Sequence, residues 1–465
     1  MTQTTPVEVQ QVWSGIRGEV LFPGDPRYDE SRQAWNLSVD QHPTAIVAVR
    51  STEDVSAAVR FAVSKGLGVA VQATGPGVKR PADGALLILT SHMRSVRVDA
   101  HSRTAWVQAG AQWGAVLEAT QAFGLAPLVG SSPNVGAVGY TLGGGMGWLA
   151  RKYGLSADSV NSFELVTADG EVLRASRTEN PDLFWGLRGG GGGGFGIVTG
   201  MEIRLYPVST VYGGNLIYPV EAAREVLARY REWVACVPDG LTSSVVLMNF
   251  PPIPDVPKFL RGQSFVMVRG CYCGPIQEGE ALVRHWREWR KPLVDDFKAM
   301  PFAQVASISN DPVDPVPAKS TGAWLRELAD GAVDVLIQYA VPTDGPPTLM
   351  LAEVRHAGGA IGRVAPDEGA YSHRDAGFSL QMVGFTPSEG ARRHFETYTE
   401  RFKGDLASYL TGGVYINFLE GEEARKRTRD AYSPEAYRRL AALKARMDPG
   451  NVFNHGLDVA SVSGS

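Results

Sequence analysis

Clusters of glycine are the residues of this chain whose spacing points most directly to chemistry. The chain holds 53 glycines among 465 residues, about 11% where roughly 7% is typical. The segments 71–77, 139–147 and 189–194 are rich in them. Glycine tolerates positive φ and lets main-chain N–H groups approach a ligand, so such loops suit a phosphate or a flat cofactor. Flexible linkers and very tight packing are the alternatives.

The residues around the second and third clusters argue against a linker. Apolar and aromatic side chains, including Met146 and Trp148, accompany the second cluster, and a solvated linker would not carry them. The third cluster lies between the apolar stretches 183–187 and 195–199. We therefore expect ligand-binding loops or points of very close packing.

Other reactive residue types form no recognisable site. Cys236, Cys271 and Cys273 make neither a CxxC motif nor a paired framework, so we expect reduced thiols in a cytoplasmic protein. The eight histidines show no HExxH pattern and no Cys/His ligand spacing, so no metal site is predicted. The GxSxG elbow of serine hydrolases and the phosphate loop of nucleotide hydrolases are both missing. No GxGxxG stands at a strand-to-helix turn with an acidic partner, which weakens an NAD-binding interpretation.

Charge and hydropathy limit the kinds of partner that are expected for this chain. The formal net charge is -4, and no basic stripe could neutralise a row of phosphates, so nucleic acid is not expected. Residues 1–10 lack the features of a secretory signal, and no segment approaches the roughly 20 apolar residues that span a bilayer. We expect a cytoplasmic protein that binds a small-molecule substrate, as a monomer or homodimer.

Strands and helices alternate in the first 200 residues. Ser51 is a candidate cap for a helix over 55–63, and a strand at 69–71 then runs into the glycine turn 74–77. Further strands are predicted at 86–89, 104–108, 163–167 and 171–174. An α+β domain with glycine loops at strand ends follows from this pattern.

The middle of the chain predicts a second domain. Apolar residues at helical spacing indicate amphipathic helices over 221–234 and 279–289. Strand-like runs occupy 243–248, 264–268, 335–339 and 378–383. A sheet with helices on one face is expected.

Several long motifs occur in a characteristic order along the chain, and together they show a resemblance to a known family that covers nearly the whole chain. They resemble the berberine-bridge-enzyme-like branch of the vanillyl-alcohol-oxidase flavoprotein family. The motifs are Thr141-Leu-Gly-Gly-Gly-Met-Gly-Trp-Leu-Ala-Arg-Lys-Tyr-Gly-Leu155, Glu179-Asn-Pro-Asp-Leu-Phe-Trp-Gly-Leu-Arg188, Phe195-Gly-Ile-Val198, Tyr415-Ile-Asn-Phe418 and Asp448-Pro-Gly-Asn-Val-Phe453.

The resemblance implies an α+β fold with a two-subdomain FAD-binding domain of the PCMH type and an α/β substrate domain, whose mainly antiparallel sheet is covered by helices. The FAD-binding domain would take residues 1–208, with its PCMH-type part at about 38–208, and the segment 411–465 would return to it. Residues 209–410 would form the substrate domain. By position, the expected FAD contacts are Ala73, Thr74, Gly75, Pro76, Gly77, Ser131, Ser132, Gly136, Gly139, Tyr140, Gly143, Gly145, Ile197 and Val198.

Departures from the family pattern bear on how FAD would be held. Relatives typically have a histidine, bonded to the flavin, where this chain has Pro76, and some have a cysteine tether where it has Ser132. Non-covalent FAD is therefore expected. The glycine run before Phe195 is one residue longer than usual and lacks an asparagine, and Gly456 and Asp458 replace two further asparagines. These changes predict an altered cofactor pocket.

For the chemistry, the resemblance makes Tyr415 the best-placed base and Asn417 a residue that orients substrate or flavin. Core packing is the alternative for Tyr415. Glu353 and Gln381, on predicted strands, are candidates for the pocket lining, and His373 is expected to be a surface or packing residue.

The leading hypothesis is an FAD-dependent oxidoreductase, an oxidase or dehydrogenase, that acts on a small organic substrate in secondary metabolism. A non-redox cyclase or isomerase on the same fold is the alternative, with FAD serving as a structural surface or lost. A binding protein without activity is a third possibility.

Overall fold

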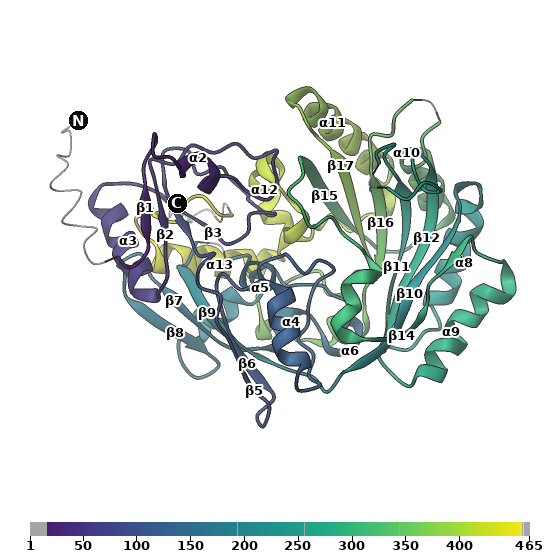
Figure 1. Ribbon diagram of the computed structural model, residues 1–465, viewed down its shortest axis with the longest axis horizontal. Coiled ribbons are helices and arrows are strands. Elements are labelled where there is room, and N and C mark those ends of the chain that lie inside the picture. Colours follow the sequence, from purple (N-terminus) through teal and green to yellow (C-terminus); the bar gives the residue numbers. More distant parts are fainter. Residues whose placement is uncertain (1–15, 193, 255, 344, 458, 460–465) are drawn as a thin grey trace.

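Three β-sheets organise the computed structural model, which describes residues 16–192, 194–254, 256–343, 345–457 and 459. The segment 1–10, Gly193 and Asp458, which entered the expectations from the sequence, lie outside these residues. Two smaller sheets belong to the N-terminal half and the largest to the middle of the chain, and the two halves lie side by side (Figure 1).

The first sheet has four strands in the order β1-β2-β4-β3. Strands β2, β4 and β3 are parallel, and β1 pairs antiparallel with β2. The helix α3 covers one face, and Ser51 caps it by accepting a hydrogen bond from the N–H of Asp54, as the sequence predicts. The short helix α2 (Tyr28–Ser31) precedes the parallel strands. The bounds are β1 Glu19–Leu21, β2 Ala45–Ala48, α3 Thr52–Ser64, β3 Val69–Gln72 and β4 Leu86–Leu89.

The second sheet has five antiparallel strands in the order β5-β6-β9-β7-β8. Helices that carry the glycine motifs pack against it. The bounds are β5 Val96–Asp99, β6 Thr104–Gln108, α4 Trp113–Gln121, α5 Ala137–Leu142, α6 Ala150–Tyr153, β7 Val160–Val166, β8 Val172–Ser176, α7 Pro181–Leu187 and β9 Ile197–Arg204.

The third sheet has eight antiparallel strands, in the order β13-β10-β12-β11-β16-β17-β15 with β14 beside β10. Helices α8, α9 and α10 lie on its outer side (Figure 1). The bounds are β10 Thr210–Pro219, α8 Ala223–Val234, β11 Leu241–Asn249, β12 Ser264–Tyr272, α9 Ile276–Trp289, β13 Val294–Asp295, β14 Lys298–Pro301, β15 Ala318–Leu325, α10 Asp330–Ala340, β16 Leu351–His356, β17 Phe378–Phe385 and α11 Glu389–Asp405.

Side-chain alternation gives the third sheet two different faces, because successive residues of a strand point to opposite sides. Val245, Val354 and Leu380 face the helices and form the core of this half. The neighbouring positions on the same strands hold polar residues such as Ser244 and Glu353. This polar face is turned toward the N-terminal half, since Ser244 and Ser131 line one cavity between them.

The predicted strand at 335–339 is wrong: these residues lie within α10. The β-branched residues of the run favour a strand only weakly, whereas its buried positions have helical spacing. Ala332, Val333, Leu336 and Ala340 are buried against the core of the third sheet. Burial of this stripe therefore outweighs the local preference for a strand.

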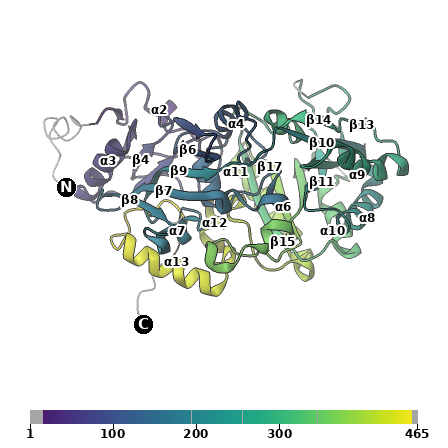
Figure 2. The same cartoon turned by 90° about the horizontal axis from the view of Figure 1, so that it is seen from below.

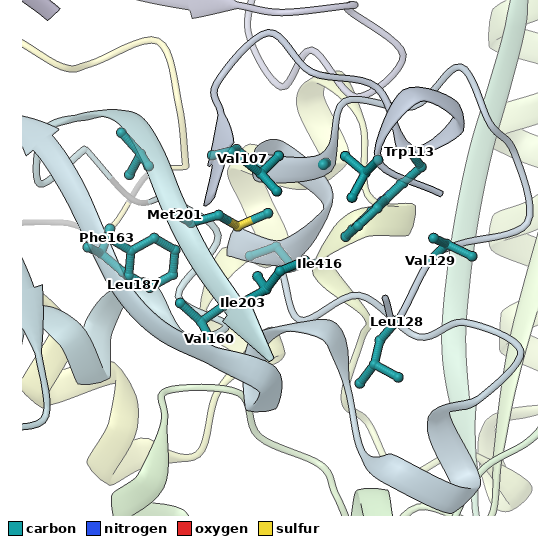
Figure 3. Close-up of a cluster of buried hydrophobic side chains, with 14 of the residues drawn as sticks. Val107, Trp113, Leu128, Val129, Val160, Phe163, Leu187, Met201, Ile203 and Ile416 are labelled. Carbon is teal, nitrogen blue, oxygen red and sulfur yellow. The ribbon is translucent and has the colours of Figure 1, made fainter. Parts of the chain in front are cut away.

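The C-terminal segment returns to the N-terminal half. Its helices α12 (Gly421–Arg427) and α13 (Pro434–Met447) follow the third sheet in sequence, yet α13 lies beside α7 (Figure 2). Ile416 packs into the core of the five-stranded sheet with Ile203 and Met201 (Figure 3). None of the helices among the described residues combines the length and the apolar character that crossing a bilayer requires.

Candidate functional site

The first two glycine motifs meet at the end of β3. The hydroxyl of Thr74 accepts a hydrogen bond from the N–H of Gly136 at 3.2 Å, and Gly75 adopts a φ of 83° that favours glycine. The turn 73–77 and the start of α5 therefore lie next to each other in the structure, although about sixty residues separate them in the sequence.

Two glycines, one in each of these segments, face open space. Gly77 and Gly139 are exposed, and a Cβ built at either position would meet no atom within 4 Å. By contrast, the glycines after α5 are packed: a Cβ at Gly144 would lie 2.6 Å from the Tyr371 ring. Among the glycines of the first two motifs, open backbone is thus found at the end of the turn 73–77 and on the exposed side of α5, where main-chain groups are accessible to a ligand.

The third glycine cluster is explained by close packing against protein. A Cβ at Gly189 would lie 2.4 Å from Tyr371, and one at Gly191 would lie 2.3 Å from Leu457. Both glycines also have positive φ. Of the two interpretations that the sequence left open, tight packing is the one found in the described part of this run.

Tyr415 lies at the junction of the C-terminal segment and the second glycine motif. Its phenol oxygen accepts hydrogen bonds from the N–H of Gly145 at 3.0 Å, from the N–H of Met146 at 3.1 Å and from Asn417 Nδ2 at 3.0 Å. The side chain is buried, with 2% of Tyr415 exposed. Burial raises the pKa of Tyr415, and the three donated hydrogen bonds oppose that rise.

Asn417 is fixed from two sides. Its Nδ2 also donates to the carbonyl oxygen of Tyr140 at 3.0 Å, and a Cβ at Gly143 would lie 1.9 Å from Asn417 Oδ1. Glycine at 143 is therefore needed for Asn417 to take this position. The buried Ile416 between the two polar residues anchors the segment.

Buried polar atoms without partners surround Tyr415. The hydroxyls of Tyr140 and Tyr371 and the indole N–H of Trp324 make no hydrogen bond within the described structure. The Tyr371 and Trp324 rings lie 5.9 and 6.1 Å from the Tyr415 ring. Unpaired buried polar groups are costly, so this cluster is suited to a polar ligand or ordered water.

A half-buried ionisable pair, Lys79 and Glu420, links the chain just after the turn 73–77 to the C-terminal segment. Lys79 Nζ donates to the carbonyl oxygens of Ile416, at 2.8 Å, and Leu419. Burial lowers the pKa of Lys79 to about 8 and raises the pKa of Glu420 to about 7, and each charge opposes the shift of the other.

The polar face of the third sheet lies opposite Tyr415. Glu353 on β16 pairs in register with Gln381 on β17, and Arg355 Nη2 bonds both, at 2.7 and 3.0 Å. The Arg355 guanidinium lies 5.1 Å from the centroid of the Phe418 ring, and the Tyr415 and Phe418 rings are 4.8 Å apart. Side chains from both halves thus meet at one place.

Comparisons with known proteins match both ends of the chain. The family model described as "FAD binding domain" matches residues 43–176, and the one described as "Berberine and berberine like" matches residues 414–459. The FAD-linked oxidoreductase YgaK of Bacillus subtilis is 30% identical, and the match covers 94% of this chain and 96% of that protein. The chain belongs to the berberine-bridge-enzyme-like family of FAD-linked oxidoreductases.

Further relatives confirm the predicted fold and reaction class. (R)-6-hydroxynicotine oxidase of Paenarthrobacter nicotinovorans is 28% identical across 96% of this chain and 97% of its own. The crystal structure of 6-hydroxy-D-nicotine oxidase from Arthrobacter nicotinovorans superposes with a TM-score of 0.83 at 24% identity, covering 96% of this chain and 98% of that one, which shows the shared PCMH-type fold. The protein is an FAD-linked oxidoreductase, and the non-redox alternative is not favoured.

Most of the residues that are expected to contact FAD fall into two groups. Ala73, Thr74, Gly75, Pro76, Gly77, Gly136 and Gly139 lie on or beside the open backbone. The side chains of Ile197 and Val198 are buried in hydrophobic cores, and Gly143 and Gly145 are closed in by Asn417 and Tyr140. Exposed main chain at adjoining turns fits a large cofactor with phosphates, so the residues present fit FAD.

Ser131 and His373 have partners that the sequence does not reveal. Ser131 Oγ donates to Asp311 at 2.6 Å, which ties the serine to the segment between β14 and β15. His373 bonds the carbonyl oxygen of Asp430 at 2.8 Å and packs on Gly413. This arrangement agrees with a packing residue.

Sequence reasoning missed the cations of the polar face. Arg355 and Arg269 surround Glu353, but they come from different strands, and no local motif links them. The sequence offers one signal for this arrangement. Successive side chains of a strand point to opposite faces, so the two-residue spacing places Arg355 on the same face of β16 as Glu353.

Proposed function

We propose that this protein oxidises a small organic substrate with non-covalently bound FAD, and that Tyr415 accepts the substrate proton. When bound, the flavin supplies the acceptor for a hydride. The donor carbon would carry an O–H or N–H group, whose proton Tyr415 removes as the carbon is oxidised.

The three hydrogen bonds on the Tyr415 oxygen are the observation that carries this proposal. A neutral hydroxyl has two acceptor lone pairs, so three converging N–H donors match a phenolate better. Hydrogen bonds to the charged form favour that form, and two of these donors are main-chain groups that cannot rotate away. These donors oppose the rise in the pKa of Tyr415 that burial causes, and this opposition supports Tyr415 as a base.

Asn417 has a positioning role in this proposal. It connects the Tyr415 oxygen to the Tyr140 carbonyl, so it adds a side-chain link to the direct bonds between the base and the second glycine motif. The unpaired hydroxyls of Tyr140 and Tyr371 are available to a polar substrate group or to water.

FAD would be held by the expected set Ala73, Thr74, Gly75, Pro76, Gly77, Ser131, Ser132, Gly136, Gly139, Tyr140, Gly143, Gly145, Ile197 and Val198, the buried members through their main chain. Neither Pro76 nor Ser132 carries the nucleophile of the family tethers. We assign residues 1–208 and 411–465 to the FAD-binding unit, 209–410 to the substrate unit, and the protein to secondary metabolism in the cytoplasm.

A visible spectrum of the purified protein, followed by acid precipitation, tests the cofactor proposal. Yellow protein whose flavin moves to the supernatant supports non-covalent FAD. Flavin that stays in the pellet contradicts the non-covalent mode, and colourless protein that FAD does not reconstitute contradicts the whole proposal. Retained hydride transfer in Tyr415→Phe across the pH range would contradict the role of the base.

A further inference from the structure

Arg355 is the charged side chain of a small cavity between the two halves. The cavity is lined from the FAD side by residues such as Ser131 and Met146, and from the third sheet by Ser243, Ser244 and Arg355. No carboxylate is among its described lining residues. His356 also lines it, but burial and the Arg151 guanidinium lower the pKa of His356 to about 3, so the imidazole is neutral at pH 7.

The ion-paired side chains behind this cavity carry more positive than negative charge. Glu353 Oε2 accepts hydrogen bonds from Arg355 Nε at 2.9 Å and Nη2 at 2.7 Å, and Glu353 Oε1 lies 3.8 Å from Arg269 Nη1. Burial acts to raise the pKa of Glu353, but attraction from both guanidinium groups overrides it, so the carboxylate is ionised. Two cations therefore share one anion.

Asp311 is the other acidic group that acts on Arg355. Its carboxylate is not among the ion pairs of the described residues, and it accepts a hydrogen bond from Ser131 at 2.6 Å instead. Asp311 thus moderates the excess positive charge from a distance. It leaves the guanidinium without a second carboxylate in contact.

Arg355 is also the accessible member of the group. Its side chain is 22% exposed, whereas those of Arg269 and Glu353 are 4% and 3% exposed. Its Nε and Nη2 are engaged by Glu353 and Gln381, while Nη1 makes no hydrogen bond to any described residue. The two N–H groups of Nη1 can therefore donate to an anion, and hydrogen bonds between charged groups are stronger than those between neutral ones.

We propose that Arg355 binds an anionic group of the substrate, and that the substrates are small organic acids. This inference rests on the proposed function, since it names the class of molecule that Tyr415 would deprotonate. The Trp148 side chain lines the cavity and the Phe418 ring lies 5.1 Å from the Arg355 guanidinium, so aromatic acids fit this site best.

Calorimetric titration of the flavin-loaded protein with benzoate, and with benzamide as its neutral match, tests this assignment. We expect benzoate to bind at least about tenfold more tightly, as for a hydrogen bond between charged groups. Arg355→Met should abolish the preference, and Arg355→Lys should retain part of it. Glu353→Gln should strengthen benzoate binding, because it removes the anion while keeping a side chain that can bond Ser244.

Arg393→Met is the matched control, since Arg393 is an exposed cation on α11, and it should leave both affinities unchanged. Flavin absorbance is measured for each variant, which separates the two proposals. Protein without flavin contradicts the proposed function. Flavin-loaded protein that binds benzoate no better than benzamide, or equally well in Arg355→Met, overturns the assignment to acids, and so does weaker benzoate binding in Glu353→Gln.

Discussion

The phenol oxygen of Tyr415 lies 3.1 Å from the backbone nitrogen of Met146, which donates a hydrogen bond to it. The tyrosine belongs to the C-terminal segment and the methionine to the second glycine motif, so the bond joins segments 269 residues apart. A main-chain donor is set by the fold, and this makes the environment of the phenol depend on how the glycine motif is shaped.

Replacing Tyr415 with Phe should lower turnover by about 10²–10⁴-fold, the usual contribution of a general base. The change leaves three buried N–H donors without an acceptor, so the free energy of unfolding should also fall by about 1–3 kcal/mol. Flavin reduction under saturating substrate and thermal unfolding measure the two effects. Tyr371→Phe is the control, since its hydroxyl has no partner in the described structure, and it should be stable. Equal stability losses in both variants would argue against the hydrogen-bond arrangement.

Introducing Ala at Gly143 should destabilise the protein by about 1–3 kcal/mol, as overpacking does. The new Cβ would meet the Asn417 side chain at 1.9 Å, and Asn417 could move only by losing its bonds to Tyr140 and Tyr415. Asn417→Ala should remove most of this penalty, so a double-mutant cycle by denaturant unfolding should show coupling of about 0.5–3 kcal/mol. Additive effects would show that Gly143 is required for another reason.

Pro76→His should create a covalent flavin bond, because it restores the residue that relatives use for the tether at this place in the turn. The readout is flavin fluorescence of the denatured protein band. Pro76→Ala removes the ring without adding a nucleophile and should give a dark band, as should the wild type. A fluorescent wild-type band would mean that another residue holds the flavin.

Stability should depend on pH through Glu420. Its pKa is raised from 4.5 to about 7 in the folded protein, so the folded state keeps a proton that the unfolded chain releases. The contribution of Glu420 to the free energy of unfolding is therefore full below pH 4.5 and is lost as the pH rises through 7, by about 3 kcal/mol. Glu420→Gln should flatten this part of the pH profile of thermal unfolding. Glu422→Gln, a change at an exposed carboxylate on α12, should leave the slope as in the wild type.

Much of the fold is predictable from local patterns. The capped helix α3, the glycine turn after β3 and the amphipathic helices α8 and α9 follow from residue spacing over a few turns. The failure at 335–339 has a different origin: Val335 and Ile337 favour a strand within this short run, and the helical spacing of the buried positions becomes visible only over the longer span 332–340.

The site is predictable where one motif contains it and unpredictable where strands must be paired. Tyr415 and Asn417 share a motif, and both lie at the junction of the halves. Ser244, Arg269 and Arg355 come from three strands, and their meeting around Glu353 depends on the register of β12, β11 and β16. A single sequence does not specify this register.

The packing of Ile416 among the strands of the first half has a consequence for biosynthesis. A ribosome delivers residues 16–204 early, but Val414, Ile416, Leu440 and Leu443, which complete their hydrophobic core, emerge only after the whole middle sheet has been made. Until then, the newly synthesised first half exposes the apolar surface that these residues later cover. The amount of chaperone that is available to shield this surface during translation, rather than the intrinsic speed of folding, should therefore limit the yield of this protein in a foreign host.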